Sequence, residues 1–192
     1  LKWKTKLNRL LSYLTFWWYS KNEHGVHSPF VFDLVTKCFY DTNATNNDPI
    51  FKKIDYKTQF LLRLGSYFKY KYIYFDASIK TNFEVILSSQ SIVKKFNTIE
   101  DLICHSKLIS ESPCLICVNI NTINTHALLN FLKQCHRDSV VLIPSIRKNK
   151  INYKSWNQLN SSSEVSVSID TYYWGLLFFR TEQLKEHFTI RL

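Results

Sequence analysis

Two cysteines stand at a spacing that is typical of redox or zinc chemistry. Cys114-Leu-Ile-Cys117 has the CxxC pattern, but it lies in an apolar run that predicts a buried strand over 114–120. Residues three apart on a strand point to opposite faces, so these thiols cannot share a metal. No second cysteine pair completes a zinc set. We therefore predict two separate core thiols here.

A pair of histidines raises the same question near the start of the chain. His24 and His27 are three residues apart, with only Glu23 and Asp33 nearby as further ligands. The segment 27–29 reads better as a helix entry, with Ser28 as N-cap and Pro29 at the first helical position. We predict a structural role for both histidines and keep metal binding as the alternative.

Basic residues give the chain a formal charge of +10 and are spread along its length. Two short runs, 69–72 and 147–150, mix them with aromatic or polar residues, which could contact single-stranded nucleic acid by stacking and phosphate contacts. They match no RNA-binding motif. We therefore favour a solvated basic surface over nucleic-acid binding.

The cysteine count and the hydropathy bear on location. Five cysteines do not form a disulfide scaffold, which predicts a reducing, cytoplasmic location. No apolar run reaches the roughly 18 residues that span a bilayer. Residues 2–20 resemble a signal peptide but are followed by no small-residue cleavage site. Their spacing predicts an amphipathic helix, which we expect to pack on the domain, with a membrane-surface role as the alternative.

Strand and helix patterns alternate along the chain. We predict an N-terminal helical extension over 1–55, which contains helices at 2–20 and from Pro29, and a single α/β domain over 56–192. Residues 41–49 read as a linker. The domain begins with a helix at 56–69, and further helices are predicted at 81–89, 101–110, 125–135 and 153–160. Strands are predicted at 72–76, 95–100, 114–120, 139–144, 165–170 and 175–180. The fold class is therefore Rossmann-like α/β, with a mostly parallel sheet and an antiparallel C-terminal hairpin.

The stretch Tyr72–Asn82 runs from a strand through a turn toward a helix. In nucleotide-binding α/β folds, glycines at this place let the backbone approach the ligand. This chain has three glycines in all and none here. No short catalytic motif of the GxSxG, HExxH or P-loop type is present either.

Two segments carry a family resemblance. HGVHSPFVFDLVTKCFY near the start and SIDTYYWGLLFFRTEQLKEHFTIRL at the end resemble the two ends of a group of bacterial class I S-adenosylmethionine-dependent methyltransferases of the O-methyltransferase branch. The resemblance implies a sheet with strand order 3-2-1-4-5-7-6, in which the last hairpin is strands six and seven.

The same resemblance implies where the cofactor would bind. The family's E-L-G-T-S-x-G loop corresponds to 74–80, where Tyr74 replaces the acid and Asp76 and Lys80 replace the glycines. Asp76, Ala77 and Ser78 are thus the implied cofactor-loop residues, but only Ser78 matches the pattern. A Cβ at the two glycine positions crowds the path of S-adenosylmethionine. We therefore expect binding of this cofactor to be lost.

Other features of the family's cofactor site are only partly present in this chain. Glu100 stands where the family's second strand ends in the acid that holds the ribose; a helix-start acid explains it equally well. Only residues 101–113 follow before the next strand, so a strand and a helix are missing. This reduced sheet leaves the strand at 95–100 as an open edge, where a protein partner or a second copy of the chain could pair.

The family's metal ligands are also replaced. Asn119 stands in the Asp-Gly-x-His type motif after strand four, and Pro144-Ser145 replaces the pair of acids after strand five. Divalent cations need carboxylates, so we expect no metal.

Three functions remain open. The first is a methyltransferase relative that no longer methylates and acts in binding or as a scaffold, and we favour it. The second is an active S-adenosylmethionine-dependent methyltransferase with an altered pocket, so whether the chain is an enzyme stays open. The third is a basic module that binds nucleic acid or a membrane surface.

Overall fold

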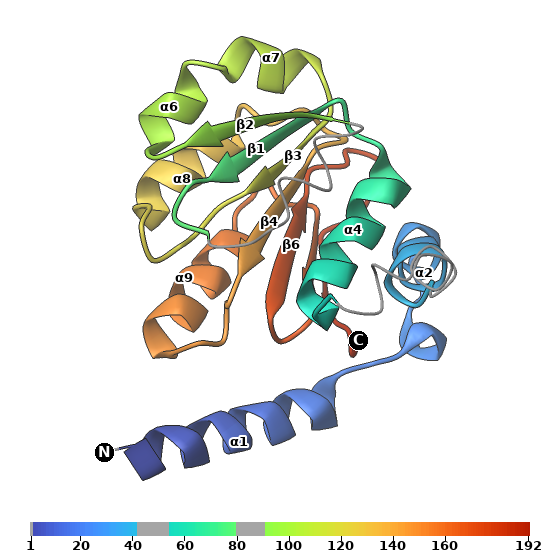
Figure 1. The fold of residues 1–192 in the computed structure, drawn as a ribbon. Helices are drawn as coiled ribbons and strands as arrows, with labels where there is room; N and C mark the ends of the chain where they lie inside the picture. Colours follow the sequence, from blue (N-terminus) through green and yellow to red (C-terminus); the bar gives the residue numbers. More distant parts are fainter. Residues whose placement is uncertain (1, 42–53, 80–90) are drawn as a thin grey trace.

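A seven-stranded sheet forms the centre of the computed structural model, which describes residues 2–41, 54–79 and 91–192 (Figure 1). Its strand order is β2-β1-β3-β4-β6-β5-β7. Of these seven strands, β6 alone runs against the others, because it pairs antiparallel with both β4 and β5. The bounds are β1 Tyr72–Asp76, β2 Ile92–Phe96, β3 Cys114–Cys117, β4 Val140–Pro144, β5 Val167–Asp170, β6 Trp174–Phe178 and β7 Glu186–Thr189. This mixed α/β sheet is compatible with a Rossmann-like fold.

Helices cover both faces of the sheet (Figure 1). One face packs against α2 (Pro29–Leu34), a π-helical turn over Val35–Phe39 and α4 (Tyr56–Phe68). The other packs against α6 (Ile99–Ile103), α7 (Ser106–Glu111), α8 (Thr125–Leu132) and α9 (Lys150–Asn160). The central strands are apolar on both faces because both faces are covered.

The two cysteines of the CxxC pattern lie on opposite faces of β3. Cys114 belongs to the core beneath α6–α9, and Cys117 to the core beneath α2 and α4. Both are buried free thiols, so the prediction of separate core cysteines is confirmed. Burial raises the pKa of Cys114 to about 11, which leaves its thiol protonated and poorly reactive near neutral pH.

Helix entries follow local capping chemistry. Ser28 Oγ accepts a hydrogen bond from Val31 N, and Pro29 opens α2, as predicted. The buried side chains of the segment 29–39, which lies in the predicted N-terminal extension, share one core with α4 and the sheet. The predicted linker over 41–49 lies outside the described residues except for Asp41, and so does the predicted helix over 81–89.

Two strand predictions need correction. The strand predicted over 95–100 is instead β2 over 92–96, because a capping box between Thr98 and Asp101 starts α6 at Ile99. Residues 97–113 then form two short helices and no strand, so β2 lies at one end of the sheet. At the other end, β7 was missed, because its sequence EHFT is short and polar.

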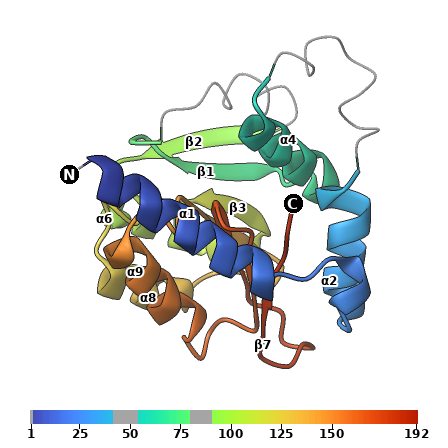
Figure 2. The same cartoon turned by 90° about the horizontal axis from the view of Figure 1, so that it is seen from below.

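The N-terminal helix α1 (Lys2–Tyr19) lies across the edge of the sheet where β4, β5 and β7 end (Figure 2). Phe16 is buried, and its ring meets that of Tyr172 at 5.3 Å between centroids. The leucines and tryptophans of α1 that are described stay exposed. The expectation that this apolar face packs on the domain is therefore wrong, since a different side of the helix makes the contact.

Backbone hydrogen bonds hold the end of α1 to the C-terminal strand. Lys21 N donates to Thr189 O at 2.8 Å, and Arg191 N donates to Lys21 O at 3.1 Å. Lys21 and Ile190 form an isolated parallel bridge. Among the described ranges, no helix has the length and hydropathy needed to cross a membrane.

Candidate functional site

Three of the predicted site residues come together where β1 and β3 end. Asp76 is the last residue of β1, Ser78 lies in the turn after it, and Asn119 follows β3. β1 and β3 are adjacent parallel strands, so their carboxyl ends meet at one edge of the sheet. In open α/β sheets this edge is where ligands bind.

The carboxylate of Asp76 is buried and its hydrogen-bonding capacity is filled by the protein. Its Oδ1 accepts from Ser78 N at 2.9 Å and from Ser78 Oγ at 2.6 Å. Its Oδ2 accepts from Asn119 N at 3.1 Å and from Thr122 Oγ1 at 3.1 Å. Asp76 is 1% exposed. Up to four donors face about four lone-pair positions, although the Thr122 hydroxyl also lies 2.9 Å from Asn119 O. The carboxylate therefore holds the two strand ends together.

Asn119 closes the same network on its outer side. Its Nδ2 donates to Ser78 Oγ at 2.8 Å, and its Oδ1 accepts from Asn121 N at 3.0 Å and from Asn121 Nδ2 at 2.7 Å. We call the five residues of this network the strand-end clamp: Asp76, Ser78, Asn119, Asn121 and Thr122. Sequence reasoning missed Asn121 and Thr122, although the polar run NINTINT after β3 was a visible signal.

Two further predicted site residues, Ala77 and Glu100, do not join the clamp. Ala77 N donates to Phe96 O at 2.9 Å, which ties the end of β1 to the end of β2. Glu100 is exposed in the first turn of α6, four residues beyond the end of β2. Its carboxylate makes no hydrogen bond or ion pair within the described residues, so it is the predicted site residue whose side chain stays available.

Tyr74 stands where the resembling family carries an acid at the end of its first strand. Its side chain is buried in the core beneath α6–α9, and its ring lies 5.6 Å from that of His105. Burial raises the pKa of Tyr74 to about 12, so the phenol stays neutral. A buried neutral phenol in this core cannot supply the negative charge of the family's acid.

A second polar cluster lies at the same edge, after β4 and β5. Arg147 Nη2 and Nε lie 2.7 Å and 2.9 Å from Asp170 Oδ2, and both side chains are largely buried. The other oxygen of Asp170 accepts from Tyr172 N at 2.7 Å. The guanidinium lies over the rings of Tyr153 and Phe16, at 4.4 Å and 5.3 Å from the centroids. This ion pair therefore links the sheet edge to α9 and α1.

The end of β4 offers no carboxylate at the positions of the family's strand-five acids. Pro144 is paired with Trp174 at the start of β6. Ser145 has a positive φ of 59°, and its N donates to Tyr173 O at 2.6 Å. Among the described residues, no group of three His, Cys, Asp or Glu side chains could hold a metal ion. The absence of a metal stays a prediction.

The basic run at 69–72 lies at the start of β1. Tyr70 donates from its hydroxyl to Asp138 O at 2.5 Å and stacks on Phe68, so its ring is engaged within the protein.

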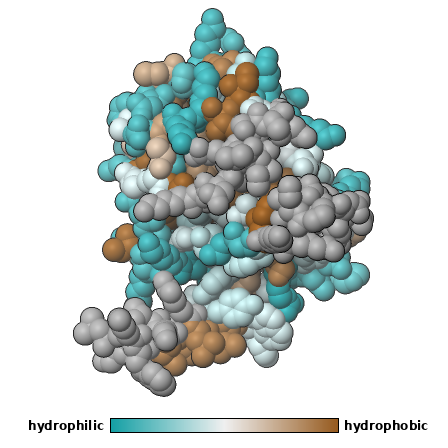
Figure 3. Space-filling view, in the orientation of Figure 1, coloured by the Kyte–Doolittle hydropathy of each residue, from teal (hydrophilic) through white to brown (hydrophobic). Residues whose placement is uncertain are grey.

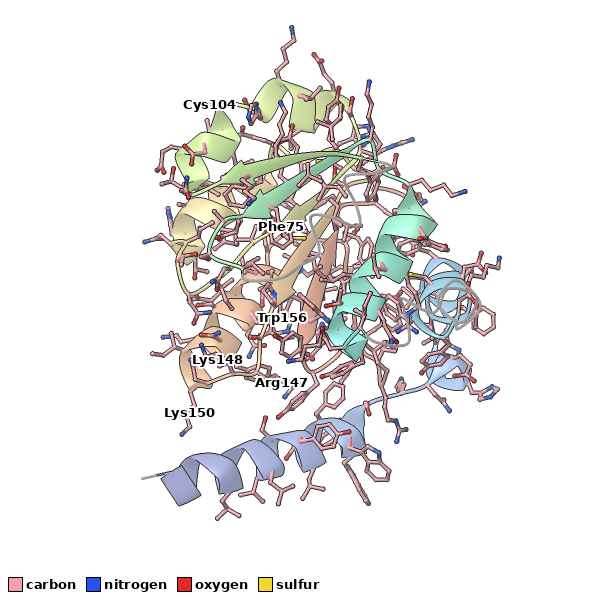
Figure 4. All side chains as sticks on the ribbon, in the orientation of Figure 1. Phe75, Cys104, Arg147, Lys148, Lys150 and Trp156 are labelled. Carbon is pink, nitrogen blue, oxygen red and sulfur yellow. The ribbon has the colours of Figure 1, made fainter. Side chains whose placement is uncertain are left out.

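Between α8 and α9 lies an open groove of about 690 Å³, whose lining includes His126, Lys150 and Lys154. This groove does not include the strand-end clamp. Figure 4 labels Lys150 on α9 close to Arg147 and Lys148.

Comparisons with known proteins do not assign the chain to a family. No protein-family model matches it. No curated protein shows significant similarity to it either.

Proposed function

We propose that this chain is a relative of the class I methyltransferases whose cofactor pocket is closed, and that it acts through binding rather than methyl transfer. The strand-end clamp carries this proposal. At the place where the family's glycine loop passes close to the cofactor, a buried aspartate is held by four donors from its own chain.

The clamp opposes cofactor binding in two ways. Its side chains occupy the space that glycines would leave for the ligand. Its acceptors are already paired, so a ligand that displaced Ser78 or Asn119 from Asp76 would leave a buried carboxylate with fewer donors, which is costly.

The order of the strands supports the relationship to the family. With the family's third strand removed, its order 3-2-1-4-5-7-6 becomes 2-1-4-5-7-6. The chain has this sequence of neighbours in β2-β1-β3-β4-β6-β5, followed by the additional strand β7. The missing strand leaves β2 at the end of the sheet, on the side where the family binds adenine. The ribose-binding acid is then represented by Glu100 in α6 rather than at a strand end.

Calorimetric titration of the folded chain with S-adenosylmethionine and S-adenosylhomocysteine tests this proposal. We expect no heat of binding and no change in the thermal unfolding midpoint. A ligand present at about one hundred times its Kd would stabilise the fold by about 2.7 kcal/mol, enough to move the midpoint by several degrees. Circular dichroism on the same sample establishes that the chain is folded.

The alternative is an active methyltransferase with an altered pocket, and the exposed Glu100 is the observation that favours it. Micromolar binding of either ligand would overturn the closed-pocket proposal. If E100Q then weakened binding while E111Q, a matched change on the neighbouring helix α7, did not, Glu100 would be the ribose ligand. The search for a methyl acceptor would follow.

A further inference from the structure

The helix α1 exposes an apolar stripe on the side that faces away from the domain. Six side chains in this helix are 46–77% exposed: Leu7, Leu10, Leu11, Leu14, Trp17 and Trp18. At about 100° per residue they fall within one arc of about 120°, the width of a helix face that packs on an apolar surface. Phe16, which makes the buried contact with the domain, lies on the opposite side.

The stripe is visible on the surface of the molecule. In Figure 3 the hydrophobic colour gathers along α1 at the bottom of the molecule, on the side turned away from the sheet. In Figure 4 some of the side chains of α1 project on that same side, and others project toward the sheet. Contact with Tyr172 and the Lys21 backbone bonds hold the helix in this orientation, so the stripe cannot turn inward without breaking them.

The charge of the helix indicates which kind of surface the apolar stripe binds. Residues 2–22 contain no acid, and four cations stand in the first part of α1: Lys2, Lys4, Lys6 and Arg9. A second copy of α1 would bring like charges together, which disfavours self-association. An anionic lipid surface complements both the charge and the stripe.

The aromatic residues point to the same occupant. Trp17, Trp18 and Tyr19 are all exposed at the end of the helix that is attached to the domain. Tryptophan and tyrosine favour the boundary between lipid headgroups and acyl chains, where one part of the ring is apolar and the other is hydrated. The helix is not long and apolar enough to span a bilayer, so the geometry suits a helix that lies in the plane of the interface.

We propose that α1 docks the protein on an anionic membrane surface through this apolar stripe, with its long axis parallel to the membrane. The edge of the sheet where β4 and β5 end then faces the bilayer, with α1 between them (Figure 2). This inference is independent of whether the cofactor pocket is closed.

Vesicle binding by the full chain tests the proposal. The probes are vesicles of phosphatidylcholine alone and vesicles with about one quarter phosphatidylglycerol, assayed by co-sedimentation and tryptophan emission. We expect binding to the anionic vesicles with a blue shift in emission, and weaker binding at high salt. The double variant L11S/L14S should lose at least about tenfold in partitioning for each leucine.

Two control variants keep the outcome decisive. L184S removes a leucine that is 84% exposed on the loop before β7, and it should bind vesicles like the parent chain. K4Q/K6Q should weaken binding to anionic vesicles about fivefold per lysine and leave the small affinity for neutral vesicles unchanged.

Three results would overturn the proposal. The first is no binding of the folded parent chain to anionic vesicles, and the second is equal loss of binding in L184S and in L11S/L14S. The third is a dimer in light scattering that L11S/L14S abolishes, together with no vesicle binding, because the stripe would then hold a second copy of the chain.

Discussion

Replacing Asp76 by asparagine changes one oxygen and removes the charge from the centre of the strand-end clamp. The carboxylate accepts from two backbone amides and two hydroxyls. An asparagine side chain keeps one acceptor oxygen, but its NH₂ group then faces the two donors, one backbone N–H and one hydroxyl, that bonded to the other oxygen. The hydroxyl of that pair can rotate to accept, but the backbone N–H cannot, so one buried donor loses its partner.

The magnitude follows from these four bonds. An unpaired buried donor costs about 1–3 kcal/mol, and the two bonds that stay lose the extra strength of a charged acceptor, about 1 kcal/mol each. Relief of the desolvation of the charge offsets part of this loss. We therefore expect D76N to lower the free energy of unfolding by about 3 kcal/mol. S78A removes one hydroxyl donor to Asp76 and also the acceptor of Asn119 Nδ2, which is exposed and can bond to water instead, so it should cost about 1 kcal/mol.

Urea unfolding at neutral pH, followed by circular dichroism and extrapolated to water, measures both changes. A loss below about 0.5 kcal/mol in D76N, within the range of ordinary surface substitutions, would refute the reasoning. It would mean that the carboxylate does not hold the strand ends together and is available to a ligand. The closed-pocket proposal would then lose its main support.

Three further predictions rest on single positions. A Cβ at Gly175 would lie 2.5 Å from the ring of Trp156, so G175A should destabilise the fold by about 1–3 kcal/mol in urea unfolding, and a neutral result would show that the ring can move. Cys104 is an exposed thiol, so in the folded chain it should react with a thiol reagent before Cys114, and C104S should lose the fast phase; an unchanged fast phase would contradict this. Hydrogen bonds from the first turn of α4 lower the pKa of Asp55, so its capping contribution to stability is present above the ordinary carboxyl range and is lost as pH falls through the lowered pKa. The difference in unfolding free energy between the parent chain and D55N should therefore shrink below about pH 4. A difference that stays constant with pH would exclude this titration.

Much of the sheet could be predicted because its strands are apolar on both faces. β3 and β4 are continuous apolar runs, and β1 is aromatic or apolar up to Asp76. A short turn joins β5 and β6 into a hairpin. β7 escaped prediction because it pairs with β5 at the end of the sheet, where burial imposes little pattern on a four-residue strand. The start of α6 was missed because the capping signal at Thr98 was assigned to a strand.

Sequence reasoning named three residues of the strand-end clamp but not the hydrogen bonds that connect them. The resemblance implied Asp76, Ser78 and Asn119 as cofactor-binding residues. They lie together at the ends of β1 and β3, and their role toward a cofactor stays a prediction. A buried aspartate after a strand can be a ligand or an internal clamp, and only the count of donors around its two oxygens distinguishes them. The orientation of α1 could not be predicted from the sequence either, because periodicity identifies an apolar stripe but not which side of the helix contacts the domain.

The attachment of α1 to β7 has a consequence for the order in which the protein can be assembled during translation. Tyr40 donates from its hydroxyl to Arg191 O, a contact between residues 151 positions apart. Lys21 pairs with the backbone of Thr189, at the end of β7, and of Arg191 just after it. When α1 leaves the ribosome, the strand that holds it has not been made. Because contacts this distant in sequence form late, the exposed leucines of α1 stay on an undocked segment, which chaperones can bind, until β7 has been made.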